Sequence, residues 1–193
     1  MPVAAVVLAV AVAGCTAGGP DPVTSSSATS AAPTPTLSPS AAASPTVSVA
    51  APQRPSEMDR TDESGARAAA VYFVNLYSYV LVTGDTAEWD SMTWETCTFC
   101  ARIREIAISI QSDGASTVGG DLTVYDIAVA HDDLLDGYPV RVGFAQEPAT
   151  RIRADGTVAK EMPRNSGHVQ VDMKWVDTGW KVLEVATVDG AQP

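Results

Sequence analysis

The sequence predicts an α+β domain, with helices in the first half of the folded segment and an antiparallel sheet in the second. Apolar residues between Thr61 and Ser112 recur with the helical period of about 3.6 residues. After Gly119-Gly120 they alternate with polar residues instead, which is the period typical of strands. Short turns separate the alternating segments, so neighbouring segments are expected to pair antiparallel.

Three helices are expected before the change of period. The first begins at Thr61, an N-cap residue followed by two acidic residues, and Gly84 stops it. Residues 85–88 resemble a capping box and open a short second helix. The third helix covers about residues 96–112 and carries an apolar stripe.

The strands are expected in the second half of the domain. Asp155-Gly156 is a type I′ hairpin signal, and Asp177-Thr178-Gly179 is a second turn. The predicted strands cover residues 122–131, 138–145, 150–154, 157–162, 169–175 and 180–188.

The charge of the chain excludes one class of function. The 193 residues include 23 acidic and 12 basic side chains, which gives a formal net charge of −11. Such a surface repels phosphate backbones, so nucleic acid is not an expected partner. Attraction to anionic lipid headgroups is disfavoured for the same reason, so membrane attachment requires an anchor.

The N-terminus supplies a candidate anchor. Residues 2–14 form an apolar stretch that is too short to span a membrane, because a spanning helix needs about 20 residues. The stretch fits a signal peptide over residues 1–14. Val12-Ala13-Gly14-Cys15 resembles the lipobox of bacterial lipoproteins, which implies lipidation of Cys15 and a location on the extracytoplasmic face of the cell membrane. The alternatives are an ordinary secretory signal or a chance apolar start.

Residues 15–55 are predicted to be a disordered tether. Residues 16–55 contain 8 Pro, 8 Ser, 6 Thr and 9 Ala, with two charged residues. This composition offers too little bulky apolar surface to offset chain entropy. As a flexible coil the tether would span roughly 35 Å. The folded domain is therefore expected over residues 56–193.

Two resemblances add to this interpretation. Residues 68–79 (AAAVYFVNLYSY), Thr83-Gly84-Asp85, Trp89 and the C-T-F-C of residues 97–100 resemble a family of uncharacterised actinobacterial lipoproteins (DUF6318-like). Three helices followed by strands that end in W-V-D-T-G-W-K-V (175–182) resemble the NTF2-like cone fold. The cone implies three N-terminal helices packed on one curved antiparallel sheet. The lipoprotein resemblance implies no activity.

Cys97 and Cys100 are the first candidate for chemistry. Outside the cytoplasm two thiols this close are expected to form a disulfide. A Cys-x-x-Cys at a helix start also occurs in redox sites, but those follow a strand, whereas helices precede this one. His131 and His168 lack the paired spacing of zinc ligands. A disulfide that closes the bend between helices is therefore favoured, and no metal ion or cofactor is expected.

Aromatic side chains supply the second candidate. The cone resemblance implies a ligand pocket between the first helix and the sheet, with Asp90 or Asp126 as a general base if the pocket is catalytic. The alternative is that these aromatic side chains, which have helical and strand spacing, form the hydrophobic core instead of a pocket. The sequence contains no motif of a hydrolase or of a phosphate-binding loop, so no catalytic residues are assigned. The pocket candidates are Tyr72, Tyr77, Trp89, Trp94, Tyr125 and Trp175.

The sequence therefore favours a non-enzymatic binding or interaction module. Its expected partner is a protein, a component of the cell envelope or an apolar small molecule. The alternatives are an enzyme acting on a small hydrophobic substrate and a Cys-x-x-Cys redox protein. A carboxylate facing into a closed cavity beside a tyrosine would favour the enzyme.

Overall fold

Helices precede strands along the chain, as the sequence predicts. The computed structural model describes residues 49–134 and 136–188, and Cys15 with most of the predicted tether lies outside them. The elements are η1 (Ser56–Asp59), α1 (Glu63–Thr83), α2 (Ala87–Met92), α3 (Thr98–Ser112), β1 (Ser116–Gly119), β2 (Leu122–Val129), β3 (Tyr138–Gln146), β4 (Ala149–Ile152), β5 (Val158–Met162), β6 (Asn165–Val176) and β7 (Gly179–Val188).

The long helix α1 is delimited by local signals. Its N-cap is Asp62, one residue after the predicted Thr61. The Asp62 carboxylate accepts hydrogen bonds from the backbone N–H groups of Ser64 and Gly65. Gly84 ends the helix in the left-handed conformation with φ 69°, as predicted.

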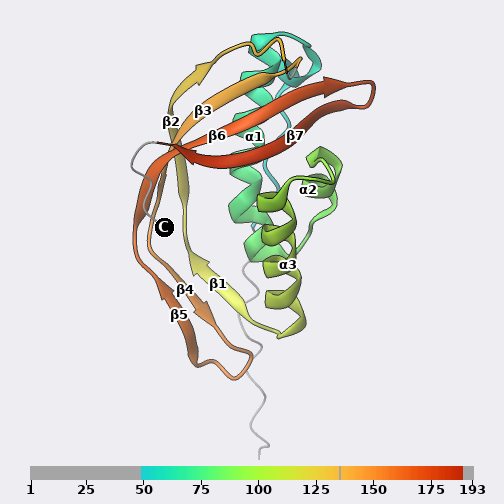
Figure 1. Cartoon of the computed structure of the whole chain (residues 1–193). Coiled ribbons are helices and arrows are strands. Elements are labelled where there is room, and N and C mark those ends of the chain that lie inside the picture. Colours follow the sequence, from blue (N-terminus) through green and yellow to red (C-terminus); the bar gives the residue numbers. More distant parts are fainter. Residues whose placement is uncertain (1–48, 135, 189–193) are drawn as a thin grey trace, which may run out of the picture. The chain divides into compact units, whose positions relative to one another are not determined.

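The strands form two antiparallel sheets. The larger sheet has the order β2-β3-β6-β7, and the smaller sheet has the order β1-β4-β5. Figure 1 shows the larger sheet passing over α1, while the smaller sheet lies at the other end of the domain, opposite α3. The α+β class is therefore as expected, but the expectation of three helices on one curved, cone-like sheet is wrong.

Glycine and proline explain the division into two sheets. The chain passes between the sheets three times: at Gly119-Gly120, at Glu147-Pro148 and at Pro163-Arg164. The two glycines have φ of 78° and 86°, outside the strand region. Proline has no N–H to donate to a ladder, so pairing stops at the other two crossings. The same break makes Ser116–Gly119 a separate strand that the alternation did not reveal.

The β4–β5 hairpin also differs from the prediction. A type I′ turn needs positive φ at both central residues. Gly156 has φ 83°, but Asp155 is not among the residues with positive φ. The Gly156 N–H donates to the Arg153 carbonyl at 2.9 Å, and the Arg153 N–H donates to the Thr157 carbonyl at 2.8 Å. The loop is therefore one residue longer than a type I′ turn.

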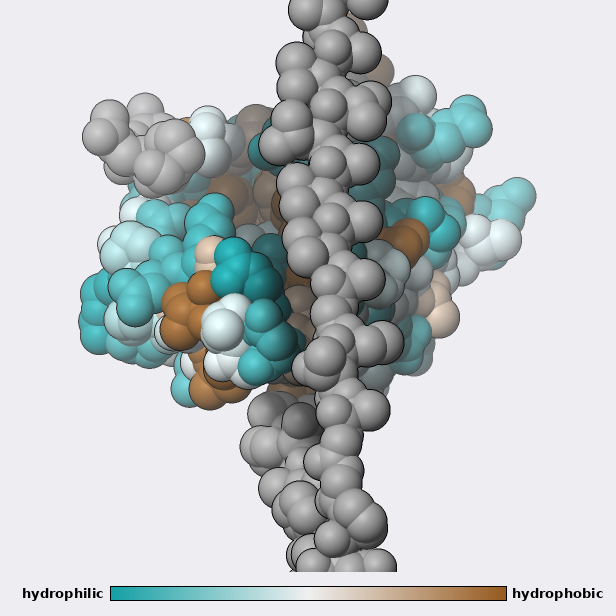
Figure 2. Space-filling model, turned by 90° about the horizontal axis from the view of Figure 1, so that it is seen from below, coloured by the Kyte–Doolittle hydropathy of each residue, from teal (hydrophilic) through white to brown (hydrophobic). Residues whose placement is uncertain are grey.

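The core lies between α1 and the larger sheet. Figure 2 views the end of the molecule that carries the β4–β5 hairpin, where hydrophilic residues cover most of the coloured surface and hydrophobic areas are small. None of the helices within residues 49–134 and 136–188 is long and apolar enough to cross a membrane. The largest fully buried side chains are Trp89, Phe73, Leu76, Met173, Val80, Val140, Val142, Val171, Val182 and Cys97.

Candidate functional site

A cavity of about 190 Å³ lies between the three helices and the larger sheet. We call it the aromatic cavity, because each helix contributes aromatic side chains to its wall. The strands supply mostly apolar residues and three polar ones, Gln146, Asn165 and Thr187. The lining residues are Phe73, Val74, Tyr77, Trp89, Phe99, Leu122, Phe144, Gln146, Asn165, Val169, Val185 and Thr187.

Ring contacts hold the aromatic wall together. Phe73 stacks on Trp89 with ring centroids 4.2 Å apart, and Tyr77 stacks on Phe99 at 6.4 Å. Trp89 also contacts Phe99 at 6.5 Å. These contacts join α1, α2 and α3, and each such pair is worth about 0.5–1.5 kcal/mol beyond burial. The wall is therefore a preformed surface.

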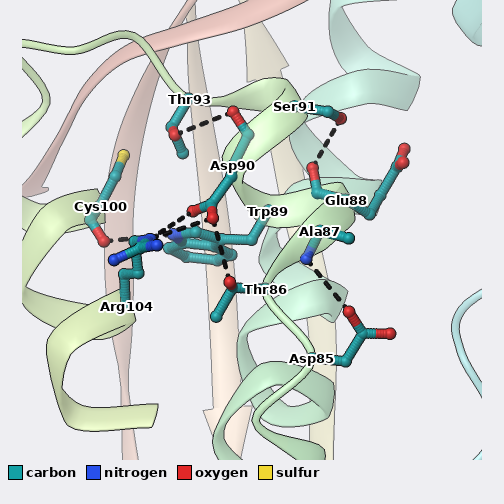
Figure 3. A network of polar contacts seen from close by, with 10 residues as sticks. All are labelled: Asp85, Thr86, Ala87, Glu88, Trp89, Asp90, Ser91, Thr93, Cys100 and Arg104. Carbon is teal, nitrogen blue, oxygen red and sulfur yellow. Dashed lines mark hydrogen bonds and ion pairs between the residues drawn. The ribbon is translucent and has the colours of Figure 1, made fainter. Parts of the chain in front are cut away.

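A polar network fixes α2 against α3 (Figure 3). The Asp90 carboxylate accepts hydrogen bonds from Thr86 Oγ1 at 3.0 Å and from Arg104 Nε at 3.0 and 3.1 Å. The Trp89 indole donates to the Cys100 carbonyl at 3.1 Å. Asp85 accepts from the Ala87 N–H at 3.1 Å. The capping box predicted for residues 85–88 is not formed: the N-cap of α2 is Thr86, whose side chain makes no cap hydrogen bond, and the Asp85 N–H donates to Thr83 Oγ1.

The two cysteines lie at the start of α3. Cys97 and Cys100 are at disulfide distance, with Cα atoms 5.2 Å apart, and their exposed fractions are 1 % and 2 %. Phe99 lies within the loop that they close and also lines the aromatic cavity. Thiol exchange requires access to a sulfur atom, which burial restricts. Both sulfur atoms therefore belong to buried residues, and the pair fixes the backbone of the loop that carries Phe99.

Glu184 caps the start of α3, a contact that the sequence did not reveal. Its carboxylate reaches from β7 to α3 and accepts hydrogen bonds from the Thr98 N–H and Oγ1, both at 3.0 Å, and from the Phe99 N–H at 3.3 Å. Burial raises the pKa of Glu184, but the backbone donors of Val185, Thr98 and Phe99 outweigh it and lower the pKa below its usual value. The helix that carries Phe99 is thus capped from the sheet.

Two of the six predicted pocket residues, Tyr77 and Trp89, line the aromatic cavity. Tyr72 is buried in the core outside the cavity, and Trp94 is 39 % exposed. Trp175 packs edge-on against the buried Trp180, with centroids 5.5 Å apart. The aromatic residues that the prediction missed are Phe73, Phe99 and Phe144.

The remaining candidate, Tyr125, lies on the opposite face of the larger sheet with Asp126 and His168. Tyr125 is 42 % exposed and contacts the His168 ring edge-on at 5.8 Å. His168 Nε2 lies 3.0 Å from the Asp126 carboxylate. The aromatic cavity therefore receives neither of the two predicted general bases, because Asp126 is on the other face and Asp90 binds Arg104.

The structure defines a class: an α+β protein whose N-terminal helices pack on antiparallel sheets. It is similar to the intermembrane-space region of the chloroplast protein ARC6, at 12 % identity and a TM-score of 0.51 over 68 % of this chain and 99 % of that one. It is also similar to the Kfla4162 protein from Kribbella flavida, at 12 % identity and a TM-score of 0.45 over 68 % of this chain and 95 % of that one. A third is an uncharacterised protein with a cystatin-like fold from Caulobacter vibrioides, at 11 % identity and a TM-score of 0.40 over 65 % of this chain and 91 % of that one.

The sequence identifies the family itself. Residues 35–186 match the family of unknown function DUF6318, and the chain belongs to this family. None of the curated proteins compared matches the sequence. The similarity to the ARC6 region, at 12 % identity, shows the fold alone.

Proposed function

We propose that the domain binds a small, uncharged aromatic or aliphatic molecule in the aromatic cavity. The observation that carries the proposal is an open volume of about 190 Å³ behind a wall of Phe73, Tyr77, Trp89 and Phe99. An engineered apolar cavity of about 150 Å³ in another protein takes up benzene. One aromatic ring with a short substituent therefore fits this cavity. The amides of Gln146 and Asn165 supply polar contacts for orienting the ligand.

Binding is better supported than acid–base catalysis. The residues lining the cavity within the described chain include no carboxylate and no imidazole. The titratable group in the wall is the Tyr77 hydroxyl, and burial raises its pKa, although the charge of Arg151 lowers it in part. A neutral phenol at physiological pH donates a hydrogen bond but does not act as a base.

We further propose that the chain is a lipoprotein attached to the extracytoplasmic face of the membrane through Cys15, with residues 15–55 as its tether. The lipobox-like residues 12–15 and the Ser/Thr/Pro/Ala-rich composition support this. Metabolic labelling with a fatty acid is expected to label the wild-type chain in the membrane fraction. Cys15→Ala is expected to remove the label, and a labelled variant would contradict the proposal.

Fluorine NMR with para-fluorotoluene tests the cavity. We expect line broadening on addition of the full-length chain and a Kd of about 0.1–1 mM, as for a small apolar fragment. Val74→Phe and Val185→Phe fill the cavity and are expected to abolish the broadening while the circular dichroism spectrum is kept. Val158→Phe is the control, because Val158 is 54 % exposed on β5. Equal binding by all variants would refute the proposal.

A further inference from the structure

A second recess lies between the C-terminal half of α3 and the smaller sheet. Figure 1 shows these elements on opposite sides of this end of the domain. We call it the α3–β4 cleft; its volume is about 710 Å³, within the range of small-molecule sites. Ile106 and Ile110 line it from α3, and Arg151 lines it from β4. Glu105, Asp113, Arg153 and Asp155 are the other charged residues of the lining.

Two buried polar atoms of the smaller sheet lack hydrogen-bond partners among residues 49–134 and 136–188. Arg151 Nε belongs to a residue that lines the cleft, and Thr117 Oγ1 belongs to a residue behind the lining. Thr117 is 7 % exposed. The two residues are directly paired across β1 and β4, so their side chains share one face of the smaller sheet. A third such atom, Arg141 Nε, belongs to the larger sheet. Buried polar groups normally have hydrogen-bond partners. Two neighbouring groups without partners therefore suggest that an acceptor from outside the chain binds here.

Three of the four other charged residues of the lining have hydrogen-bond partners close to them in sequence. Arg153 donates to Thr157 Oγ1 at 3.1 Å and to the Val158 carbonyl at 2.8 Å. Asp155 accepts from Thr157, and Asp113 accepts from Ser109 at 3.4 Å. Glu105 lies on the exposed side of α3. Of the two arginines that line the cleft, Arg151 is therefore the one with a buried N–H that has no acceptor among residues 49–134 and 136–188.

We propose that the α3–β4 cleft binds a small monocarboxylate with an apolar body. Its carboxylate accepts hydrogen bonds from the Arg151 guanidinium and the Thr117 hydroxyl, and its apolar part lies against Ile106 and Ile110. Arg binds carboxylates through two parallel hydrogen bonds. Glu105, Asp113 and Asp155 repel more highly charged anions, which favours a single negative charge over a phosphate.

The influence of Arg151 on Tyr77 agrees with this position. The charge of Arg151 lowers the pKa of the Tyr77 hydroxyl, against the larger opposing effect of burial. The strand pairing gives the same placement: Arg151 shares a face of the smaller sheet with Thr117, which is buried, so this is the inner face. The site is separate from the aromatic cavity in its lining residues, and its proposal does not rest on ligand binding there.

Fluorine NMR on the full-length chain with para-fluorobenzoate tests the site. Arg151→Gln is expected to weaken binding about ten- to a hundredfold, which corresponds to losing a charge-assisted hydrogen bond. Arg164→Gln is the matched control, because it removes the same charge from a residue outside the lining that pairs with Glu147. Binding of neutral para-fluorotoluene is expected to stay unchanged in both variants, so a failure of this proposal is distinguishable from a failure of the first.

Thr117→Val provides a readout that a merely structural role would not give. Valine keeps the shape but removes the buried unpaired hydroxyl, so the free energy of unfolding is expected to hold or rise. The affinity for para-fluorobenzoate is expected to fall severalfold. Equal binding of para-fluorobenzoate by wild type, Arg151→Gln and Thr117→Val would overturn the proposal, as would an equal loss of affinity in Arg164→Gln.

Discussion

Glu184→Ala tests whether the sheet holds the start of α3. The carboxylate accepts hydrogen bonds from the Thr98 and Phe99 N–H groups and from the Thr98 hydroxyl. Removing an N-cap acceptor costs about 0.5–2 kcal/mol, and bonds to a charged acceptor lie at the upper end. We therefore expect Glu184→Ala to lower the free energy of unfolding by about 1–2 kcal/mol. Glu184→Gln keeps an acceptor but loses the charge at the helix end, and about 0.5–1 kcal/mol is expected.

The stability of the same variants is also expected to depend on pH. The pKa of Glu184 is lower in the folded protein than in the unfolded chain, where it is about 4.3. The carboxylate therefore stabilises the fold above that pH and loses its contribution as pH falls through the folded-state value. Urea unfolding at pH 7 and at about pH 3 is expected to show the difference between wild type and Glu184→Gln shrinking in acid.

The control for this series is Glu161→Ala, which removes an exposed carboxylate from β5. Its free energy of unfolding is expected to stay within about 0.5 kcal/mol of wild type. If Glu184→Ala were as mild as Glu161→Ala, the cap would contribute nothing to stability. If the Glu184→Gln difference were the same at both pH values, the charge of the carboxylate would not be the cause.

Three further predictions concern stability, each measured by urea unfolding. Trp89→Phe removes the indole donor to the Cys100 carbonyl and is expected to cost about 1–3 kcal/mol, whereas Trp94→Phe, at a 39 % exposed position, is expected to cost less than about 0.5 kcal/mol. Gly143→Ala is expected to cost about 1–3 kcal/mol, because the added Cβ would lie 2.6 Å from the Tyr125 ring and 2.8 Å from its carbonyl oxygen. The double variant Cys97→Ser/Cys100→Ser is expected to cost about 2 kcal/mol, the loop entropy of a short disulfide, and an unchanged free energy would show that the pair is not bonded.

The spacing of apolar residues predicted the helices and strands, because each of these elements is formed by residues that are close together in the sequence. The apolar stripe of α1 and the alternation in β3 and β6 report which face is buried, and Gly84 signals a helix end by its own backbone conformation. The division into two sheets depends on hydrogen bonds between segments far apart. Pro148 and Pro163 mark where ladders stop, but each also fits a loop between strands of one sheet, so the sequence could not distinguish the two arrangements.

The site was harder to predict than the elements. Aromatic side chains at α1 positions share one buried face, and which of them borders a cavity depends on how tightly the sheet packs there. Tyr72 and Phe73 are adjacent in sequence, yet Phe73 lines the aromatic cavity and Tyr72 does not. The cap by Glu184 joins residues separated by 86 positions, and it has no local signal. Arg151 and Thr117 look like ordinary strand residues in the sequence. Only the structure shows that they are paired across two strands and that each has a buried polar atom without a partner among the described residues.

The break between the sheets accounts for both recesses. Gln146 and Asn165 pair at the last position of the larger sheet, just before Pro148 and just after Pro163. Because the ladder stops there, no further strand residues close the end of the aromatic cavity, and the two amides border it. Beyond the break the smaller sheet lies opposite α3 (Figure 1). The α3–β4 cleft lies between these two elements. A single smoothly curved sheet would keep its side chains against the helices throughout, so the glycine and proline crossings are what give this fold two separate recesses.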